Sequence, residues 1–232
     1  MALLRYLLYM IGIAGFTGLL TWMEISAPGS LMFYVSEGAH DPYGTSEYSP
    51  VEIIQPGMLA ICGLLYAWVA RDCPSQRPIA FAFGGFALIA IIRELDYFFD
   101  HLVADNFWQV LVAIIGALLI VYTIRHRRRF RIALLRLWPS PGLTLLFAGA
   151  TIHFGFALII GHDPFWRAVM GDDYVRIVKL AVEEMVELMG YFLWLIGTIE
   201  YAFQARAIAF REPQHVVAKR RAGRQPKSEG RF

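Results

Sequence analysis

Charged side chains are scarce in this sequence, and long stretches of it contain none at all. Asp, Glu, Lys and Arg together make up 17% of the chain, whereas a soluble domain carries about 25%. Hydrophobic residues make up 57% and aromatic residues 15%. This balance excludes an ordinary soluble domain and predicts a protein that meets lipid over much of its surface.

Cysteine is nearly absent. Cys62 lies inside a predicted helix and Cys73 in the linker that follows it, so neither is placed for a disulfide or a Cys-x-x-Cys metal site. The sequence also lacks a His-Glu-x-x-His motif and the paired Glu-x-x-His of di-iron bundles. These absences disfavour a redox role for the thiols and a dinuclear oxygenase.

Six apolar runs are present, each near the ~20 residues that cross the hydrocarbon core of a bilayer. We therefore expect an all-α, polytopic membrane helical bundle with six transmembrane helices. The runs cover 3–23, 51–70, 79–99, 107–124, 143–161 and 174–203. The six helices form one domain over 1–205 with an outer loop at 24–50, and a basic, disordered cytoplasmic tail follows over 206–232.

The linkers alternate in charge. If the amino terminus is cytoplasmic, 17 of the 21 Lys and Arg residues fall on the cytoplasmic side, most densely over 125–131 and 206–232. The linkers on the opposite side are acidic, with Arg167 as their single cation. Their acidic residues are Glu37, Asp41, Glu47, Asp105, Asp163, Asp172 and Asp173. The positive-inside rule therefore predicts that both termini are cytoplasmic, in a bacterial inner membrane.

The basic segments have an expected partner in anionic lipid headgroups, which attract each nearby cation by about 1 kcal/mol. Nucleic-acid binding is disfavoured, because a basic flank beside a spanning helix already has this explanation.

Ionisable residues inside the predicted spans are costly in lipid and usually face the bundle interior or a wet cavity. On a regular third helix, Arg93, Asp96 and Asp100 would fall within about 60° of one another, and Glu94 and His101 would nearly superpose. These two stripes mark one face of the helix as polar.

The sixth helix carries three carboxylates, Glu183, Glu184 and Glu187, on an arc of about 100°. Cations, a metal or protons must offset charges this close together in a low-dielectric site. Lys179 lies one turn before Glu183 and is spaced to pair with it. Nearby aromatic residues, including Tyr191 and Trp194, are interpreted as packing.

A rise of about 1.5 Å per residue places the acidic groups of both helices in the outer half of the membrane and His153 near its middle. We expect one cavity, open to the outside. Carboxylates favour calcium, magnesium or manganese, and added imidazoles favour zinc or iron. The predicted metal ligands are Glu94, Asp96, His101, His153, Glu183, Glu184 and Glu187.

A structural network is the alternative to a metal site. In that interpretation Arg93, Asp100 and Lys179 form ion pairs that lock the third helix to the sixth. A bis-His haem, using His101 with His153 or His162, is a further alternative.

Two segments carry a resemblance: Arg-Glu-Leu-Asp at 93–96 and Glu-Glu-Met-Val-Glu at 183–187. They resemble uncharacterised bacterial multi-pass inner-membrane proteins that combine an Arg-Glu-x-Asp helix with a late Glu-Glu-x-x-Glu helix. The resemblance covers most of the spanning region and implies no activity.

Three functions follow from these patterns. The first is a metal-dependent hydrolase of a lipid or lipid-linked substrate, in which the metal lowers the pKa of a bound water and Glu183 or Glu187 is the general base. The second is a non-catalytic subunit or assembly factor of a membrane complex, or a homo-oligomer, with a structural charge network. The third is cation or proton translocation through the carboxylates of the sixth helix.

Overall fold

The computed structural model describes the backbone of residues 2–31 and 49–222 and the side chains of 3–31 and 49–211. Every regular element in these residues is a helix, which confirms the predicted all-α class. Most of the expected outer loop at 24–50 lies outside the described residues. The helices are α1 Ala2–Ser26, α2 Pro50–Asp72, α3 Arg77–Glu94, α4 Asp96–Leu102, α5 Phe107–Arg125, α6 Arg127–Leu137, α7 Pro141–Thr151, η1 Ile152–Ala157, α8 Leu158–Ile160, α9 Asp163–Met170, η2 Gly171–Asp173 and α10 Arg176–Ala222.

Four helices in the described part of the chain are long and apolar enough to cross a membrane. They are α1, α2, α5 and the continuous helix Pro141–Ile160 that α7, η1 and α8 form. The bent pair of α3 and α4 makes a fifth if it counts as one span. The sixth predicted run lies in α10, whose first twelve residues include Arg176, Lys179 and the three carboxylates, so this helix is more polar than the other four.

The predicted third helix, 79–99, is not continuous. α3 ends at Glu94, and α4 begins at Asp96 with an axis bent by 61°. The carboxylate of Asp96 accepts a hydrogen bond from the backbone N–H of Tyr97 at 2.6 Å. A short polar side chain that binds nearby backbone in this way competes with the helical ladder.

The predicted disordered tail also needs correction, because α10 continues as a helix to Ala222. The sequence just past residue 205 is rich in Ala and Arg, which favour the helical state. Only 223–232 of the expected tail lie outside the described residues.

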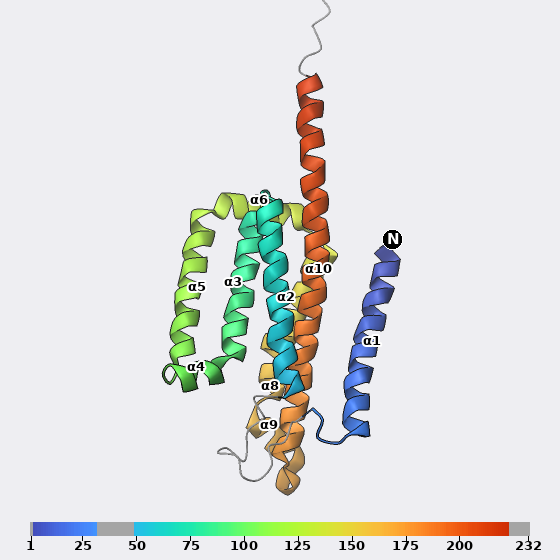
Figure 1. The fold of residues 1–232 in the computed structure, drawn as a ribbon, viewed down its shortest axis with the longest axis vertical. Helices are drawn as coiled ribbons and strands as arrows, with labels where there is room; N and C mark the ends of the chain where they lie inside the picture. Colours follow the sequence, from blue (N-terminus) through green and yellow to red (C-terminus); the bar gives the residue numbers. More distant parts are fainter. Residues whose placement is uncertain (1, 32–48, 223–232) are drawn as a thin grey trace, which may run out of the picture.

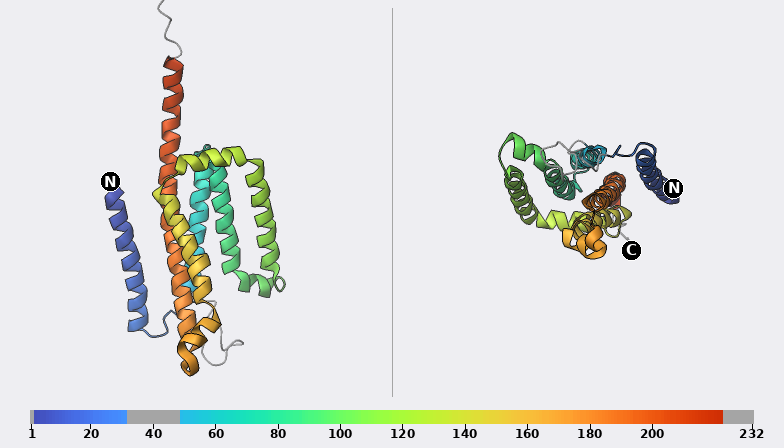
Figure 2. Two further views of the ribbon diagram at one scale, coloured as in Figure 1. Left: turned by 180° about the vertical axis from the view of Figure 1, so that it is seen from behind. Right: turned by 90° about the horizontal axis from the view of Figure 1, so that it is seen from below.

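The core of the bundle is formed by α2, α3, α10 and the helix Pro141–Ile160, while α1 and α5 lie at opposite margins (Figures 1 and 2). The amphipathic helix α6 crosses one end of the bundle, where Ala133 and Leu137 are buried against it and its arginines lie on the remaining faces. The amino terminus and the projecting end of α10 lie at this same end, whereas α4 and α9 lie at the other (Figure 1).

The closest helix contact joins α7 to α10 and is made by glycines seven residues apart on each helix. A Cβ at Gly149 would lie 2.6 Å from the carbonyl oxygen of Gly190, and a Cβ at Gly197 would lie 2.7 Å from the backbone nitrogen of Leu146. A Cβ at Gly142 would lie 2.8 Å from the backbone of Tyr201. Small residues are what lets two helix backbones approach this closely without a hydrophobic driving force.

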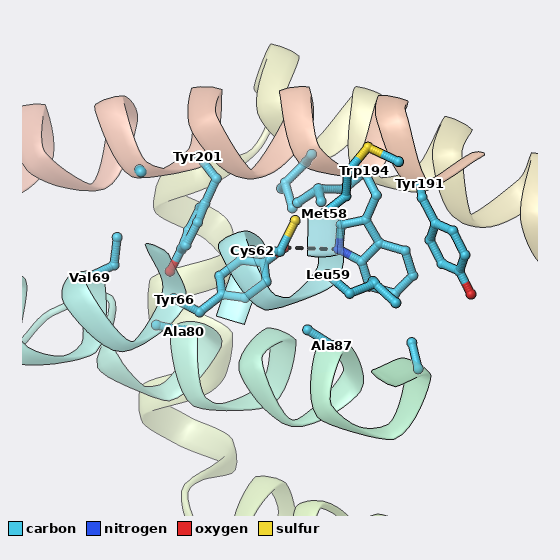
Figure 3. Packing of buried hydrophobic residues seen from close by; sticks show 14 of the residues in the cluster. Met58, Leu59, Cys62, Tyr66, Val69, Ala80, Ala87, Tyr191, Trp194 and Tyr201 are labelled. Carbon is cyan, nitrogen blue, oxygen red and sulfur yellow. Dashed lines mark hydrogen bonds between the residues drawn. The ribbon is translucent and has the colours of Figure 1, made fainter. Parts of the chain in front are cut away.

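Aromatic side chains fill the space between α2, α3 and α10 (Figure 3). Trp194 Nε1 donates to the hydroxyl of Tyr66 at 3.1 Å, and the Tyr66 hydroxyl lies 2.7 Å from Thr198 Oγ1. Thr198 in turn donates to the carbonyl of Trp194. The polar atoms of these buried aromatics are therefore satisfied, as burial requires.

A buried carboxylate of α10 contacts the first turns of α1. Glu200 is fully buried, accepts a hydrogen bond from the Tyr9 hydroxyl at 2.6 Å and lies 3.2 Å from Arg5 Nε. Farther along α1, the ring of Phe16 stacks on that of Phe192 with centroids 5.1 Å apart. Elsewhere α1 is largely exposed.

Replacing Gly149 by Val tests the close contact. We expect Gly149→Val to lower the free energy of unfolding in detergent by about 1–3 kcal/mol, because the added methyl groups overlap backbone rather than a movable side chain. Gly116→Val is the matched control, since a Cβ at Gly116 in α5 meets nothing within 4 Å. Equal losses of stability in the two variants would show that helix propensity, and not the contact, sets the effect.

Candidate functional site

Arg93, in the last turn of α3, is the centre of a polar cluster between three helices. Its Nη2 lies 2.7 Å from Glu94 Oε1, 2.9 Å from His153 Nε2 and 3.6 Å from Glu187 Oε2. These partners come from α3, η1 and α10 respectively. The guanidinium side chain is 40% exposed, whereas His153 is only 3% exposed. One cation thus contacts three elements.

Tyr191 of α10 completes the cluster. Its hydroxyl donates to Glu94 Oε1 at 2.6 Å and lies 3.0 Å from His153 Nε2. The rings of His153 and Tyr191 are also in contact, with centroids 4.3 Å apart. Tyr191 was interpreted from the sequence as packing, but it follows Glu187 by one turn, and that spacing places the two on one helix face.

The position of His153 depends on a short π-helix. η1 interrupts the regular helix between α7 and α8, and His153 is its second residue. π-helices are rare and occur often at functional sites, because the extra residue per turn re-aims the side chains around it. A Cβ at Gly190 would lie 3.0 Å from the His153 Cβ, so the absence of a side chain at Gly190 makes room for this histidine.

The other two carboxylates of α10 have separate partners. Glu183 Oε2 lies 2.7 Å from Lys179 Nζ, and Lys179 is also 3.9 Å from Asp163 of α9. Glu184 Oε2 accepts a hydrogen bond from Gln55 Nε2 of α2 at 3.0 Å. A line of acidic groups therefore follows α10 from Glu183 to the Arg93 cluster.

Three predicted residues are not part of the cluster, because the bend at Leu95 carries them away on α4. Asp96 binds the backbone of Tyr97, and Asp100 accepts from the N–H of Asn106 at 2.8 Å. The Nδ1 of His101 is bonded to the Tyr97 carbonyl at 2.9 Å. Arg93 pairs with neither Asp96 nor Asp100, and the predicted superposition of Glu94 and His101 is wrong.

The donor set of the cluster does not fit a divalent metal. Within the described part of the chain, no three His, Cys, Asp or Glu residues are placed to hold an ion. His153 Nε2 and Glu94 Oε1 both meet Arg93, so a positive group already lies where these two ligands converge. The same contact occupies the nitrogen that His153 would offer to a haem iron.

Gln55, which is fully buried beside the site, is not among the residues that the sequence pattern predicts. It lies in the first turns of α2, one residue before Pro56, and only the packing of α2 on α10 brings it to Glu184. No spacing within one helix signals a contact of this kind.

Comparison of the chain with protein-family models, with curated proteins and with solved structures finds no match. Function therefore has to be argued from the site itself.

Removing the charge of Arg93 tests its central role. We expect Arg93→Met to destabilise the protein by about 2 kcal/mol, because Glu94 and Glu187 lose a charged partner in a partly buried site. Arg71→Met is the control, since Arg71 pairs with Asp72 on an exposed surface, where an ion pair contributes little to stability. Thermal unfolding of both variants in detergent is the measurement, and similar shifts would contradict a central role for Arg93.

Proposed function

We propose that this chain is a six-span protein of a bacterial inner membrane, with both termini in the cytoplasm, and that it acts as a non-catalytic subunit or assembly factor of a membrane complex. The observation that carries the proposal is the Arg93 cluster, in which a cation ties α3, η1 and α10 together through side chains that catalysis would need free.

The orientation rests on where the charges lie. The arginine-rich α6 lies across one end of the bundle, together with the amino terminus and the projecting part of α10 (Figure 1). An amphipathic basic helix in this position suits the interface of a leaflet rich in anionic lipids. α9 and the acidic η2, which carries Asp172 and Asp173, lie at the opposite end, which we assign to the periplasm.

The proposed partner surface is α1. Only 6% of its most apolar stretch is buried within the chain. Gly12, Gly15 and Gly18 lie on one side of it, and a Cβ at any of them would meet nothing within 4 Å. Glycines at close spacing in an apolar helix favour contact with another helix, because they let the backbones approach. The occupant is a spanning helix of a second copy or of another membrane protein.

A metal-dependent hydrolase is less well supported. The two carboxylates predicted as general bases, Glu183 and Glu187, face Lys179 and Arg93. Elemental analysis of the purified protein tests this hypothesis directly, because it requires stoichiometric metal.

Enlarging the glycines of α1 tests the subunit proposal. The expected assembly is larger than the 26.3 kDa chain in a mild detergent, and Gly15→Leu should reduce it to the monomer by keeping the helix backbones apart. Gly63→Leu is the control, because Gly63 of α2 also has open space around it. Native mass measurement gives the answer, and a wild-type protein that is monomeric and captures no partner would contradict the proposal.

Translocation of a cation or proton is a second candidate, favoured by the excess of acid along α10. Glu183, Glu184 and Glu187, with Glu94, outnumber the cations Lys179 and Arg93. If these carboxylates exchange cations, liposomes containing the protein will show a flux that Glu187→Gln abolishes. Asp100→Asn is the control, since Asp100 is bonded locally in α4. A flux equal in both variants would exclude the carboxylates of α10 as carriers.

A further inference from the structure

An apolar groove of about 200 Å³ lies between α3, α7, η1 and α10. All of the residues that line it are apolar or aromatic, and they include Phe83, Leu143, Ala150 and Phe154. Phe154 is 53% exposed, so the groove is open at the side of the bundle. Within a membrane such an opening faces lipid chains rather than water.

The groove begins close to the end of the bundle where α6 lies. Leu143 is the third residue of α7, and Phe83 lies about 9 Å along α3 from its first residue, Arg77. Phe154 follows Leu143 by eleven residues, so the groove extends about 16 Å along the helix that contains both. The groove therefore runs from near one end of the bundle toward its middle.

α6 lies across this end of the groove. It joins α5 to α7 and packs against α3, and seen from behind it crosses in front of α3 between those two helices (Figure 2). A spanning helix of another protein is at least about 10 Å wide, and it would have to continue past α6 to cross the membrane. A narrow chain that ends at α6 meets no such obstacle.

The exposed side chains of α6 supply positive charge at this end. Arg127, Arg129 and Arg131 are exposed, and no ion pair within the described part of the chain includes any of them. The sequence over 106–162 contains no Asp or Glu. Trp138, which follows α6 directly, is 63% exposed, and Trp is enriched where a membrane meets water. The groove therefore ends at the level of lipid headgroups, beside cations that have no acidic neighbour in the sequence.

A phospholipid with a net negative headgroup matches both the groove and α6. Its acyl chains are narrow, flexible and apolar, like the space that the groove offers. Its phosphate suits arginine, because a guanidinium binds two phosphate oxygens through paired N–H groups. A zwitterionic headgroup carries in addition an ammonium group, which the cations of α6 repel. The site should therefore prefer an anionic phospholipid to a zwitterionic one with the same chains.

We propose that the groove holds an acyl chain of a phospholipid of the cytoplasmic leaflet, and that the exposed arginines of α6 bind the anionic headgroup of the same lipid. The inference rests on the proposed location of α6 at the cytoplasmic surface. It goes beyond a general attraction of basic segments to anionic lipids, because a chain held in the groove makes one lipid a stoichiometric ligand of the bundle.

The test is native mass spectrometry of the full-length protein in detergent, with phosphatidylglycerol or phosphatidylcholine of the same acyl chains added. We expect the first phosphatidylglycerol to bind at least about tenfold more tightly than the first phosphatidylcholine. Ala150→Phe fills the groove and leaves α6 unchanged, and it should weaken the binding of phosphatidylglycerol about tenfold. Ala113→Phe, at an exposed position of α5, is the matched control and should bind as the wild type does.

The headgroup contact is tested by removing charge. Replacing Arg127, Arg129 and Arg131 together by Gln should lower the affinity for phosphatidylglycerol to that for phosphatidylcholine. Replacing the three cations of 219–221 by Gln is the matched control, because it removes the same charge from the projecting end of α10 (Figure 1). This control should keep the wild-type preference for phosphatidylglycerol.

Three results would each overturn the proposal: equal affinity of the wild type for the two lipids, equal affinities in Ala150→Phe and Ala113→Phe, or equal losses in the two charge variants. Ala150→Leu is a smaller change at the same place in the groove and replaces Ala150→Phe if that variant does not fold. In detergent neither the orientation of the chain in a membrane nor a protein partner enters the measurement. A failure of this inference is therefore distinguishable from a failure of the proposed function.

Discussion

The guanidinium of Arg93 within an apolar bundle is the interaction on which the arrangement of the helices depends. A charged side chain within a membrane helix is costly unless it is paired, so Arg93 needs partners. α3 supplies only Glu94, and the others, His153 and Glu187, come from η1 and α10. The approach of η1 to α10 depends on Gly149 and Gly190, which have no side chains at the crossing. Ion pairing and close glycine packing therefore act as one constraint, which fixes three elements relative to one another.

The arrangement explains why a site that looks suitable for a metal from its composition is better described as a charge network. Carboxylates and an imidazole do converge, but they converge on a cation that the chain itself provides. A divalent ion would have to displace Arg93 and leave it without partners, at a cost comparable to that of burying any unpaired charge. The remaining carboxylates lie nearer the start of α10. There Glu183 pairs with Lys179, and Glu184 accepts a hydrogen bond from Gln55. The carboxylates are thus separated into small groups, each with its own donor.

The helices themselves were predictable, because long apolar runs have few other solutions, and the contact of α3 with α10 followed from the polar residues that each carries. The grouping around Arg93 was predicted only in part. Asp96 and His101 were assigned to it on the assumption of a regular helix to residue 99, but the chain bends by 61° between α3 and α4. The π-helix at His153 likewise leaves no periodic signal in the sequence. The glycines at 142, 149, 190 and 197 were a readable signal, since their seven-residue spacing on two helices matches a close crossing.

Two local costs coincide at His153. A π-helix is less favourable than the α-helix it interrupts, and a buried donor without a partner is less favourable than one that is paired. Holding Arg93 alone would require neither the π-helix nor the unpaired donor. A regular helix could present a side chain that accepts a hydrogen bond from Arg93 and has no donor of its own. Sequences that depart from local rules at one residue usually do so where the site has a function beyond stability. In this cluster Arg93 joins the helices, and both local costs fall on the histidine that it contacts.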